Sequence, residues 1–212
     1  MSNIDNKKMR YKHIIKTALC SLGFELHRSR SVSNPSVQLL AALKHVQAEM
    51  VFDVGANVGQ FAQALRSVGF SGEIISFEPM SSEHAILVKR SRGDCNWRIH
   101  PRTAVGDEDR EIEINISGNS VSSSILPMLD AHSSAAMNSG YIATERAPMC
   151  RLDSVVPMYL SADTRAFIKI DTQGFESQVL NGAAETLKKV QGVVLELSLV
   201  PLYDGQTLWL EM

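Results

Sequence analysis

The sequence contains few cysteines and no long apolar run. Its 212 residues include only three cysteines, Cys20, Cys95 and Cys150, and no Cys-x-x-Cys pair. This odd, widely spaced set argues against a disulfide framework or a zinc site and is typical of a reducing compartment. No stretch approaches the roughly 20 apolar residues that cross a bilayer. The polar start, Met1–Arg10, lacks the apolar core of a signal peptide, so we expect a cytoplasmic protein.

The sequence also lacks a large excess of charge of either sign. Lysine and arginine number 21 against 23 aspartate and glutamate residues, which gives a formal net charge of -2. A domain that binds nucleic acid is usually strongly basic, so we expect no nucleic-acid partner. The hydrophobic share of 44% and the charged share of 21% are those of an ordinary globular protein with a sizeable core.

We predict two parts, a helical and basic N-terminal extension over residues 1–47 and a main domain over residues 48–212. Within Lys7–Phe24, apolar residues recur at helical spacing and lysines lie between them. Two interpretations stay open for this helix. It packs its apolar stripe on the main domain, or it makes weak contact with an anionic membrane surface. Ser31–Pro35 then predicts a linker, and Val37–Val46 a second helix.

From Met50 onward, short apolar segments alternate with segments of helical spacing. The predicted strands are Val51–Val54, Ile74–Phe77, Trp97–His100, Phe167–Ile170 and Val193–Leu197. The predicted helices lie at Phe61–Val68, Glu83–Arg90, Phe175–Leu180 and Ala183–Val190. This alternation predicts an α/β fold with a doubly wound, mostly parallel sheet, Rossmann-like and covered on both faces. Such folds bind their ligands at the carboxyl ends of the strands.

Two further segments interrupt this alternation. Arg110–Ile116 alternates polar and apolar residues, which predicts an exposed strand of a hairpin. Ser117–Ala147 is rich in Ser, Asn, Gly and Met and predicts a long loop or insertion. Long loops inside compact domains are usually functional, so we expect this one to shape a substrate pocket.

The first predicted strand ends in an acid and a glycine loop, Asp53-Val54-Gly55-Ala56-Asn57-Val58-Gly59. Glycine allows the backbone to approach a ligand closely and to adopt a positive φ angle. The Gly-x-x-x-Gly spacing differs from the Gly-x-Gly-x-x-Gly fingerprint of dinucleotide sites. An acid at this strand end would repel a pyrophosphate, whereas it suits an amino group or a sulfonium. The loop therefore favours S-adenosylmethionine over NAD.

A second acid, Glu78, closes the next strand, roughly 20 residues beyond the loop, where a carboxylate can accept hydrogen bonds from both hydroxyls of a ribose. Pro79 follows it and ends the strand. Taken alone, Glu78 fits a solvated surface charge equally well, and Asp53 fits a turn acid. Two acids at successive strand ends, with the glycine loop between them, point to one nucleoside-type ligand.

Four motifs resemble, in the same order, those of the FkbM family of methyltransferases: Phe52–Gly59, Ser76–Pro79, Arg151–Asp153 and Ile168–Glu176. The resemblance implies methyl transfer from S-adenosylmethionine to a hydroxyl oxygen, often on a sugar, a glycan or a small natural product. It also implies which residues bind the cofactor. They are Asp53, Gly55, Ala56, Asn57 and Gly59 at the methionine end, Glu78 and Pro79 at the ribose, and Thr103 and Ala104 at the adenine.

Class I methyltransferases normally add a helix and an antiparallel strand pair after the fifth strand. Here the sequence runs only through Leu199–Tyr203 to Met212, so we expect the fold to lack that C-terminal strand pair. An exposed edge strand would invite homo-oligomers. The alternative function is therefore a truncated or degenerate module that binds S-adenosylmethionine or a partner without catalysis.

Asp171, directly after the fourth predicted strand, is the first candidate for a catalytic residue. It could act as a general base, as a hydrogen-bond acceptor for the substrate hydroxyl, or as a ligand of a divalent ion. Glu176 also fits a role at a helix start, and Glu196 could pair with Lys169, so both are weaker candidates. His100 at a strand end is more often structural. Clustered acids without histidine suit Mg²⁺ better than zinc, but we predict no metal site.

Overall fold

The structure is a computed structural model that describes residues 34–161 and 163–212. The chain divides into two compact units, Met1–Gln38 and Leu39–Met212, and the account below concerns the second unit. The helix predicted over Lys7–Phe24 and its proposed contacts lie outside the described residues. In the part that the structure describes, no helix is both long enough and apolar enough to span a bilayer.

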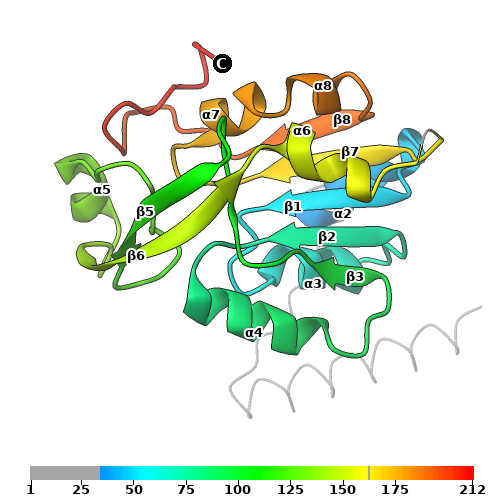
Figure 1. Ribbon diagram of the computed structural model, residues 1–212, viewed down its shortest axis with the longest axis horizontal. Helices are drawn as coiled ribbons and strands as arrows, with labels where there is room; N and C mark the ends of the chain where they lie inside the picture. Colours follow the sequence, from blue (N-terminus) through cyan, green and yellow to red (C-terminus); the bar gives the residue numbers. More distant parts are fainter. Residues whose placement is uncertain (1–33, 162) are drawn as a thin grey trace, which may run out of the picture. The chain divides into compact units, whose positions relative to one another are not determined.

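Five parallel strands form the central sheet, in the order β3-β2-β1-β7-β8 (Figure 1). They are β1 Met50–Val54, β2 Glu73–Phe77, β3 Trp97–Ile99, β7 Ala166–Ile170 and β8 Gly192–Leu195. The central strand β1 pairs with β2 on one side and with β7 on the other, in parallel register. The strand order reverses between β1 and β7, which is where doubly wound folds bind ligands. The predicted Rossmann-like α/β fold is confirmed.

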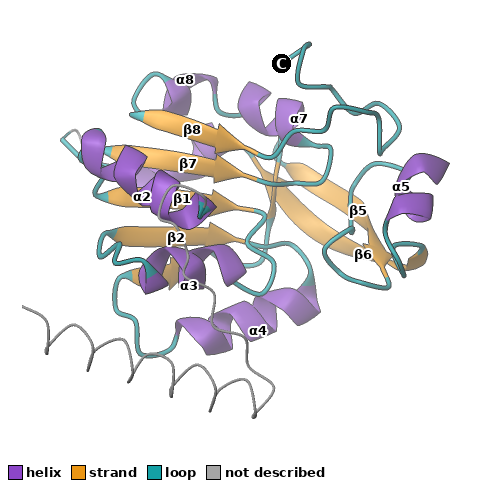
Figure 2. Cartoon of the chain, turned by 180° about the vertical axis from the view of Figure 1, so that it is seen from behind, coloured by secondary structure: helices purple, strands orange, loops and turns teal. Residues whose placement is uncertain are grey.

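Helices cover both faces of this sheet because alternate strand residues are apolar toward opposite sides. On one face the strands pack on α2 Pro35–His45, α3 Gln60–Ser67 and α4 Ser81–Ser91. On the other face they pack on α6 Leu152–Val155, the 3₁₀ turn η2 Val156–Met158, α7 Glu176–Asn181 and α8 Ala184–Leu187. Figure 2 shows α2 and α3 in front of the sheet, and Figure 1 shows α6 and α8 on the opposite side.

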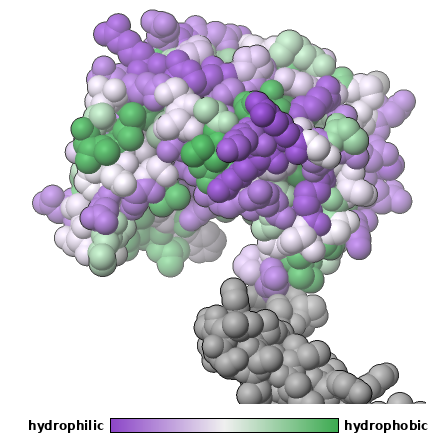
Figure 3. Space-filling view, turned by 90° about the horizontal axis from the view of Figure 1, so that it is seen from below, coloured by the Kyte–Doolittle hydropathy of each residue, from purple (hydrophilic) through white to green (hydrophobic). Residues whose placement is uncertain are grey.

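The two edges of the sheet differ. Beside the edge strand β3 lies α4, and the view of that side in Figure 3 shows mostly hydrophilic residues with apolar residues in separate patches. At the other edge, β7 is the one strand of the described residues that pairs with β8. The prediction that this edge invites self-association stays a prediction.

A second sheet of three strands adjoins the first. It contains β4 Ala104–Val105, β5 Arg110–Ser117 and β6 Tyr141–Cys150, with β5 and β6 forming a long antiparallel hairpin (Figure 1). The prediction of a loop over the whole of Ser117–Ala147 is therefore wrong from Tyr141 onward. The first six residues of β6 are exposed or only partly buried, so the sequence shows no alternation of apolar and polar residues there. The insertion proper, residues 118–140, contains the short helix α5 Asp130–Ala135.

The chain after β8 folds back onto this insertion. Residues 196–212 form no further strand of either sheet, in agreement with the predicted lack of a C-terminal strand pair. Instead, Tyr203 makes an isolated bridge with Met128. The backbone N–H of Leu129 donates to the carbonyl of Leu202, and that of Asp204 to the carbonyl of Pro127. Tyr203 is 1% exposed, so this C-terminal segment is anchored by a buried side chain.

Candidate active site

The carboxyl ends of the central strands bring four predicted acids to one edge of the sheet. Asp53 lies near the end of β1, Glu78 directly after β2, Asp171 directly after β7 and Glu196 directly after β8. Figure 1 shows the arrowheads of these strands pointing the same way, toward the β5–β6 hairpin. This is the edge at which a doubly wound fold binds its ligand.

The loop between β1 and α3 has a left-handed backbone at three positions, Gly55 (φ 73°), Asn57 (φ 48°) and Gly59 (φ 89°). A Cβ at Gly55 would lie 1.8 Å from the carbonyl oxygen of Asp171, which leaves room for glycine alone. A Cβ at Gly59 would lie 2.7 Å from the Trp97 ring. Both glycines thus let the loop pack closely on protein atoms, and their contact with a cofactor stays a prediction.

The carboxylate of Asp53 is completely buried. The Ser76 hydroxyl donates to Oδ2 over 3.1 Å, and the Trp97 indole N–H in turn donates to Ser76 Oγ over 3.0 Å. Oδ1 forms an ion pair with Lys169 Nζ at 3.2 Å. Ser76 and Lys169 are the residues paired with Asp53 on the two neighbouring strands. The oxygens of Asp53 therefore join three strands beneath the glycine loop, and direct contact with a cofactor stays a prediction.

Lys169 is the cation at the centre of this arrangement. Its Nζ lies 3.4 Å from Asp171 Oδ2 and donates to the carbonyl oxygen of Gly55 over 3.0 Å. The ammonium also lies 5.4 Å from the centre of the Phe61 ring, a cation–π distance. Burial by itself would lower the pKa of Lys169, but the charges of Asp53 and Asp171 outweigh it and raise the pKa. Lys169 is therefore a charged link between the ends of β1 and β7.

Glu78 is bound to the glycine loop. Its Oε2 accepts a hydrogen bond from the backbone N–H of Asn57 over 2.7 Å, and its Oε1 accepts one from the N–H of Met80 over 2.9 Å. The residue is only 3% exposed. Burial raises the pKa of Glu78 to about 7, although the two N–H donors oppose the rise. Each carboxylate oxygen can accept a further hydrogen bond, so the group keeps free acceptor capacity.

The segment that follows β3 lies next to Glu78 and Pro79. The Arg102 guanidinium donates to the carbonyl oxygen of Pro79 over 2.9 Å and pairs with Glu145 of β6 at 2.9 Å. The buried Thr103 donates its hydroxyl to the carbonyl oxygens of Ala104 and Pro148. The three segments predicted to hold the cofactor are thus connected: the loop to Glu78 through Asn57, and Pro79 to the Thr103–Ala104 segment through Arg102.

Comparison with models of known protein families identifies the family of this chain. The model of the methyltransferase FkbM domain matches residues 53–212. The chain belongs to the FkbM methyltransferase family. None of the curated proteins with which the chain was compared matches it. The matched region contains all four acids, the glycine loop and Lys169, so the predicted resemblance to this family is confirmed.

In this FkbM-family methyltransferase, Asp171 is held from two sides. Lys169 pairs with its Oδ2, and the Gln173 side-chain amide donates to its Oδ1 over 2.7 Å. Its side chain is 25% exposed, against 12% for Lys169 and none for Asp53. The Asp171 charge and burial raise the pKa of the neighbouring Glu196. Of the two carboxylates paired with Lys169, Asp171 is thus the more exposed.

Glu176 serves the loop after β7. Its Oε1 accepts from the backbone N–H of Thr172 over 2.9 Å, and both oxygens accept from the N–H of Gly174. The side chain is 2% exposed, and burial raises its pKa. Because both oxygens are used within the loop, the geometry favours a structural role at the helix start.

His100 also has structural partners. Its Nδ1 lies 2.7 Å from the Tyr159 hydroxyl, and its ring packs on Phe77 with centroids 4.8 Å apart. Burial lowers the pKa of His100, which favours the neutral imidazole. The expectation that this histidine is structural agrees with these contacts.

Sequence reasoning named Lys169 only as a partner of Glu196, whereas it pairs with Asp53 and Asp171. It missed Gln173 and Tyr203, which the structure also brings to the site. A signal for Lys169 existed, because a lysine within an otherwise apolar parallel strand is unusual. Gln173 lay within a quoted motif, but nothing in the sequence indicates that its side chain turns back to Asp171. Tyr203 comes from the distant C-terminal segment, and the sequence carries no signal for its position.

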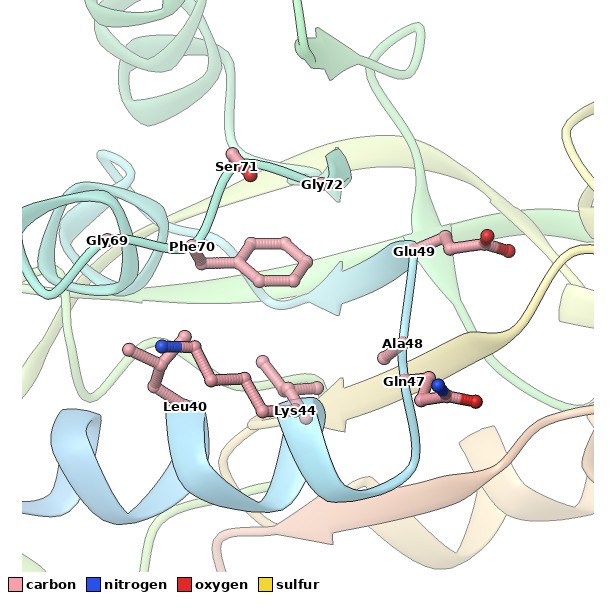
Figure 4. Close-up of a pocket in the computed structure, with 10 residues that line it drawn as sticks. Leu40, Lys44, Gln47, Ala48, Glu49, Gly69, Phe70, Ser71 and Gly72 are labelled. Atoms are coloured by element: carbon pink, nitrogen blue, oxygen red, sulfur yellow. The ribbon is translucent and has the colours of Figure 1, made fainter.

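A separate cavity of about 390 Å³ lies away from this site, between the end of α2 and the turn before β2 (Figure 4). Leu40, Lys44, Glu49 and Phe70 are among the residues that line it, and Glu49 directly precedes β1. The cavity therefore opens at the amino ends of the strands, opposite the four acids. Among the described residues, no group of three or more His, Cys, Asp or Glu side chains is placed to hold a metal ion.

Proposed function

We propose that this methyltransferase uses S-adenosylmethionine and methylates a hydroxyl oxygen of a sugar, a glycan or a small natural product. The observation that carries the cofactor assignment is the contact between Glu78 and the glycine loop. This contact places the buried Glu78 carboxylate beside a backbone that is left-handed at Gly55, Asn57 and Gly59. A ribose at this carboxylate would put the rest of a nucleoside along the loop.

The residues present fit such a nucleoside better than a dinucleotide. Two ribose hydroxyls donating to Glu78 would stabilise the carboxylate that burial otherwise destabilises. A pyrophosphate, in contrast, would need a free cation, and the nearby cation Lys169 already has two carboxylate partners. The proposed contacts at the methionine end come from the loop, and those at the adenine from Pro79, Thr103 and Ala104.

The cofactor supplies a methyl group that its sulfonium has already activated. The protein then has to orient the acceptor oxygen in line with that methyl group and receive the hydroxyl proton. We assign this role to Asp171, because it is the more exposed of the two carboxylates paired with Lys169 and is fixed by Lys169 and Gln173. In this assignment the hydroxyl first donates a hydrogen bond to Asp171. Its proton would pass to the Asp171 carboxylate as the acceptor oxygen takes the methyl group, whose bond to the sulfonium sulfur breaks to leave S-adenosylhomocysteine.

Calorimetric titration with S-adenosylmethionine tests the cofactor assignment. We expect Glu78→Gln to weaken binding about tenfold or more, because the amide cannot accept from both backbone N–H groups and both ribose hydroxyls. The matched control is Glu73→Gln at the opposite end of β2, where the exposed carboxylate pairs with Arg98. It should bind like the unaltered protein. Failure of the unaltered protein to bind would refute the cofactor, and equal binding by Glu78→Gln would refute the role of Glu78.

The acceptor class is tested by transfer of a labelled methyl group to a panel of sugars and other polyhydroxylated compounds. Mass spectrometry should show one added methyl on oxygen. We expect Asp171→Asn to reduce the transfer rate about 100-fold, the lower range for loss of a general base, without weakening cofactor binding. A methyl group on nitrogen or carbon would contradict the proposed reaction. Cofactor binding without transfer to any hydroxyl would favour the non-catalytic alternative.

A further inference from the structure

In the turn after β7, a residue with a long side chain has a left-handed backbone conformation. Gln173 adopts φ 53° and Gly174 φ 99°, both in the left-handed region. A side chain costs free energy there, whereas glycine adopts this conformation readily. The presence of glutamine at the first of the two positions indicates that its side chain is used.

Both ends of the Gln173 amide have partners. Its Nε2 donates to Asp171 Oδ1 over 2.7 Å, and its Oε1 accepts from the Tyr203 hydroxyl at 3.2 Å. An amide that flipped would place its oxygen against the Asp171 carboxylate, which cannot donate when ionised. Burial raises the pKa of Tyr203, so its hydroxyl keeps the proton that it donates. The Asp171 carboxylate thus fixes which end of the amide faces it, and the Tyr203 hydroxyl holds the other end, Oε1, in place.

Two segments far away in the sequence hold this turn in place. The Tyr203 hydroxyl also lies 3.2 Å from the carbonyl oxygen of Ser122, in the insertion. The Ser124 hydroxyl donates to the backbone carbonyl of Gln173 over 2.7 Å. Tyr203 packs against Gly174, where a Cβ would lie 3.0 Å from its ring. The insertion and the C-terminal segment therefore meet at Gln173, and we call Ser122, Ser124, Gln173 and Tyr203 the acceptor wall.

We propose that Gln173 and Tyr203 are positioning residues for the methyl acceptor, with Tyr203 orienting the Gln173 amide and the amide orienting Asp171. The acceptor wall braces Asp171 through Gln173 from within the protein, because Ser122, Ser124 and Tyr203 are buried. This inference rests on the proposed function, because it gives Asp171 the hydroxyl of the acceptor. Among the described residues, three other charged side chains face Asp171: Lys169 on β7, Glu196 after β8 and Glu176 on α7.

The test compares Tyr203→Phe with Tyr141→Phe. Tyr141 belongs to β6 and donates its hydroxyl to the carbonyl of Leu126 in the insertion, over 2.6 Å. Both variants lose one hydroxyl that donates to the insertion, but only Tyr203 contacts Gln173. The first measurement follows hydrogen exchange of the Gln173 side-chain amide by nuclear magnetic resonance. We expect about tenfold faster exchange in Tyr203→Phe and no change in Tyr141→Phe.

The second measurement uses methyl transfer to whichever panel compound serves as acceptor. Tyr203→Phe should lower kcat about tenfold, the effect of one lost hydrogen bond, with cofactor affinity unchanged. Gln173→Gly keeps the left-handed backbone but removes the amide. Because Tyr203 acts through Gln173, adding Tyr203→Phe to Gln173→Gly should cause no further loss. S-adenosylhomocysteine should bind all these variants within twofold of the unaltered protein.

Three results would overturn the inference: unchanged amide exchange in Tyr203→Phe, equal effects of the two tyrosine substitutions, or additive losses in the double variant. The exchange measurement needs neither cofactor nor acceptor. It therefore tests the link between Tyr203 and Gln173 even if S-adenosylmethionine fails to bind, a result that would instead refute the proposed function.

Discussion

The two halves of the site are built in different ways. On the proposed cofactor side, the glycine loop after β1 binds Glu78, a residue 21 positions from Asn57, through the backbone N–H of Asn57. On the acceptor side, the contacts join residues 49 and 81 positions apart, Ser124 with Gln173 and Ser122 with Tyr203. A contact that the loop makes through its backbone depends little on which side chains the loop carries. The proposed acceptor side depends instead on the side-chain hydroxyls of Ser124 and Tyr203.

Lys169 joins the two halves. It binds Asp53 and the Gly55 carbonyl on the cofactor side, and Asp171 on the acceptor side. The carbonyl of Asp171 also lies against Gly55, so the backbones of the two halves touch at that point. Substitutions at this junction should therefore have larger effects than substitutions within either half.

The largest expected effect is that of Lys169→Met. It removes the cation that faces the buried Asp53, and breaking a buried ion pair by losing one partner costs about 3–5 kcal/mol. Urea denaturation measures the change in the free energy of unfolding. Lys188→Met is the control, because Lys188 forms an exposed pair with Glu185 whose loss should cost under about 0.5 kcal/mol. A cost below about 1 kcal/mol for Lys169→Met would show that Asp53 does not depend on this cation.

Gly55→Ala should destabilise the protein by about 3 kcal/mol. The new methyl would overlap the Asp171 carbonyl and would sit on a left-handed backbone. Gly69→Ala separates these two causes, because Gly69 has φ 100° but no atom within 4 Å of a built Cβ. That control should lose only about 1 kcal/mol, the cost of backbone strain. Equal losses in both variants would mean that the glycine loop and the Asp171 carbonyl can move apart at no cost in free energy.

Affinity for the proposed cofactor should depend on pH through the titration of Glu78. With a pKa of about 7, its carboxylate is mostly protonated at pH 6 and mostly ionised at pH 8. If ribose hydroxyls donate to the ionised form, affinity for S-adenosylmethionine should be about tenfold higher at pH 8 than at pH 6. Glu78→Gln should remove this dependence. The same slope in that variant would place the titrating group elsewhere.

The smallest effect is expected for Tyr159→Phe, outside both halves. Loss of the hydroxyl that contacts His100 should lower the free energy of unfolding by about 1 kcal/mol. Cofactor affinity should stay unchanged. A tenfold loss of affinity would instead connect His100 with the binding site.

The fold and the placement of Asp53, the glycine loop and Glu78 at one edge of the sheet could be predicted from the sequence because their signals are local. Apolar strands such as β1 and β7 are short and end in acids, and the glycine loop follows its acid directly. The family match over residues 53–212 agrees with the motifs from which the resemblance was inferred.

The acceptor half could not be predicted, for physical reasons. The first residues of β6 are only partly buried or exposed, so no alternation marks them as a strand. The position of Tyr203 depends on its bridge to Met128, a pairing 75 positions away that no local pattern encodes. The role of Lys169 depends on the register that places it beside Asp53, which only the assembled sheet defines.

The most direct test of the account measures whether Glu78 binds the ribose. S-adenosylhomocysteine and its 2′-deoxy analogue would be titrated into the unaltered protein and into Glu78→Ala. We predict that loss of the hydroxyl weakens binding about tenfold in the unaltered protein, through one hydrogen bond to a charged group, and has no effect in the variant. Equal losses in both proteins would contradict the assignment of Glu78 to the ribose and, with it, the proposed position of the cofactor.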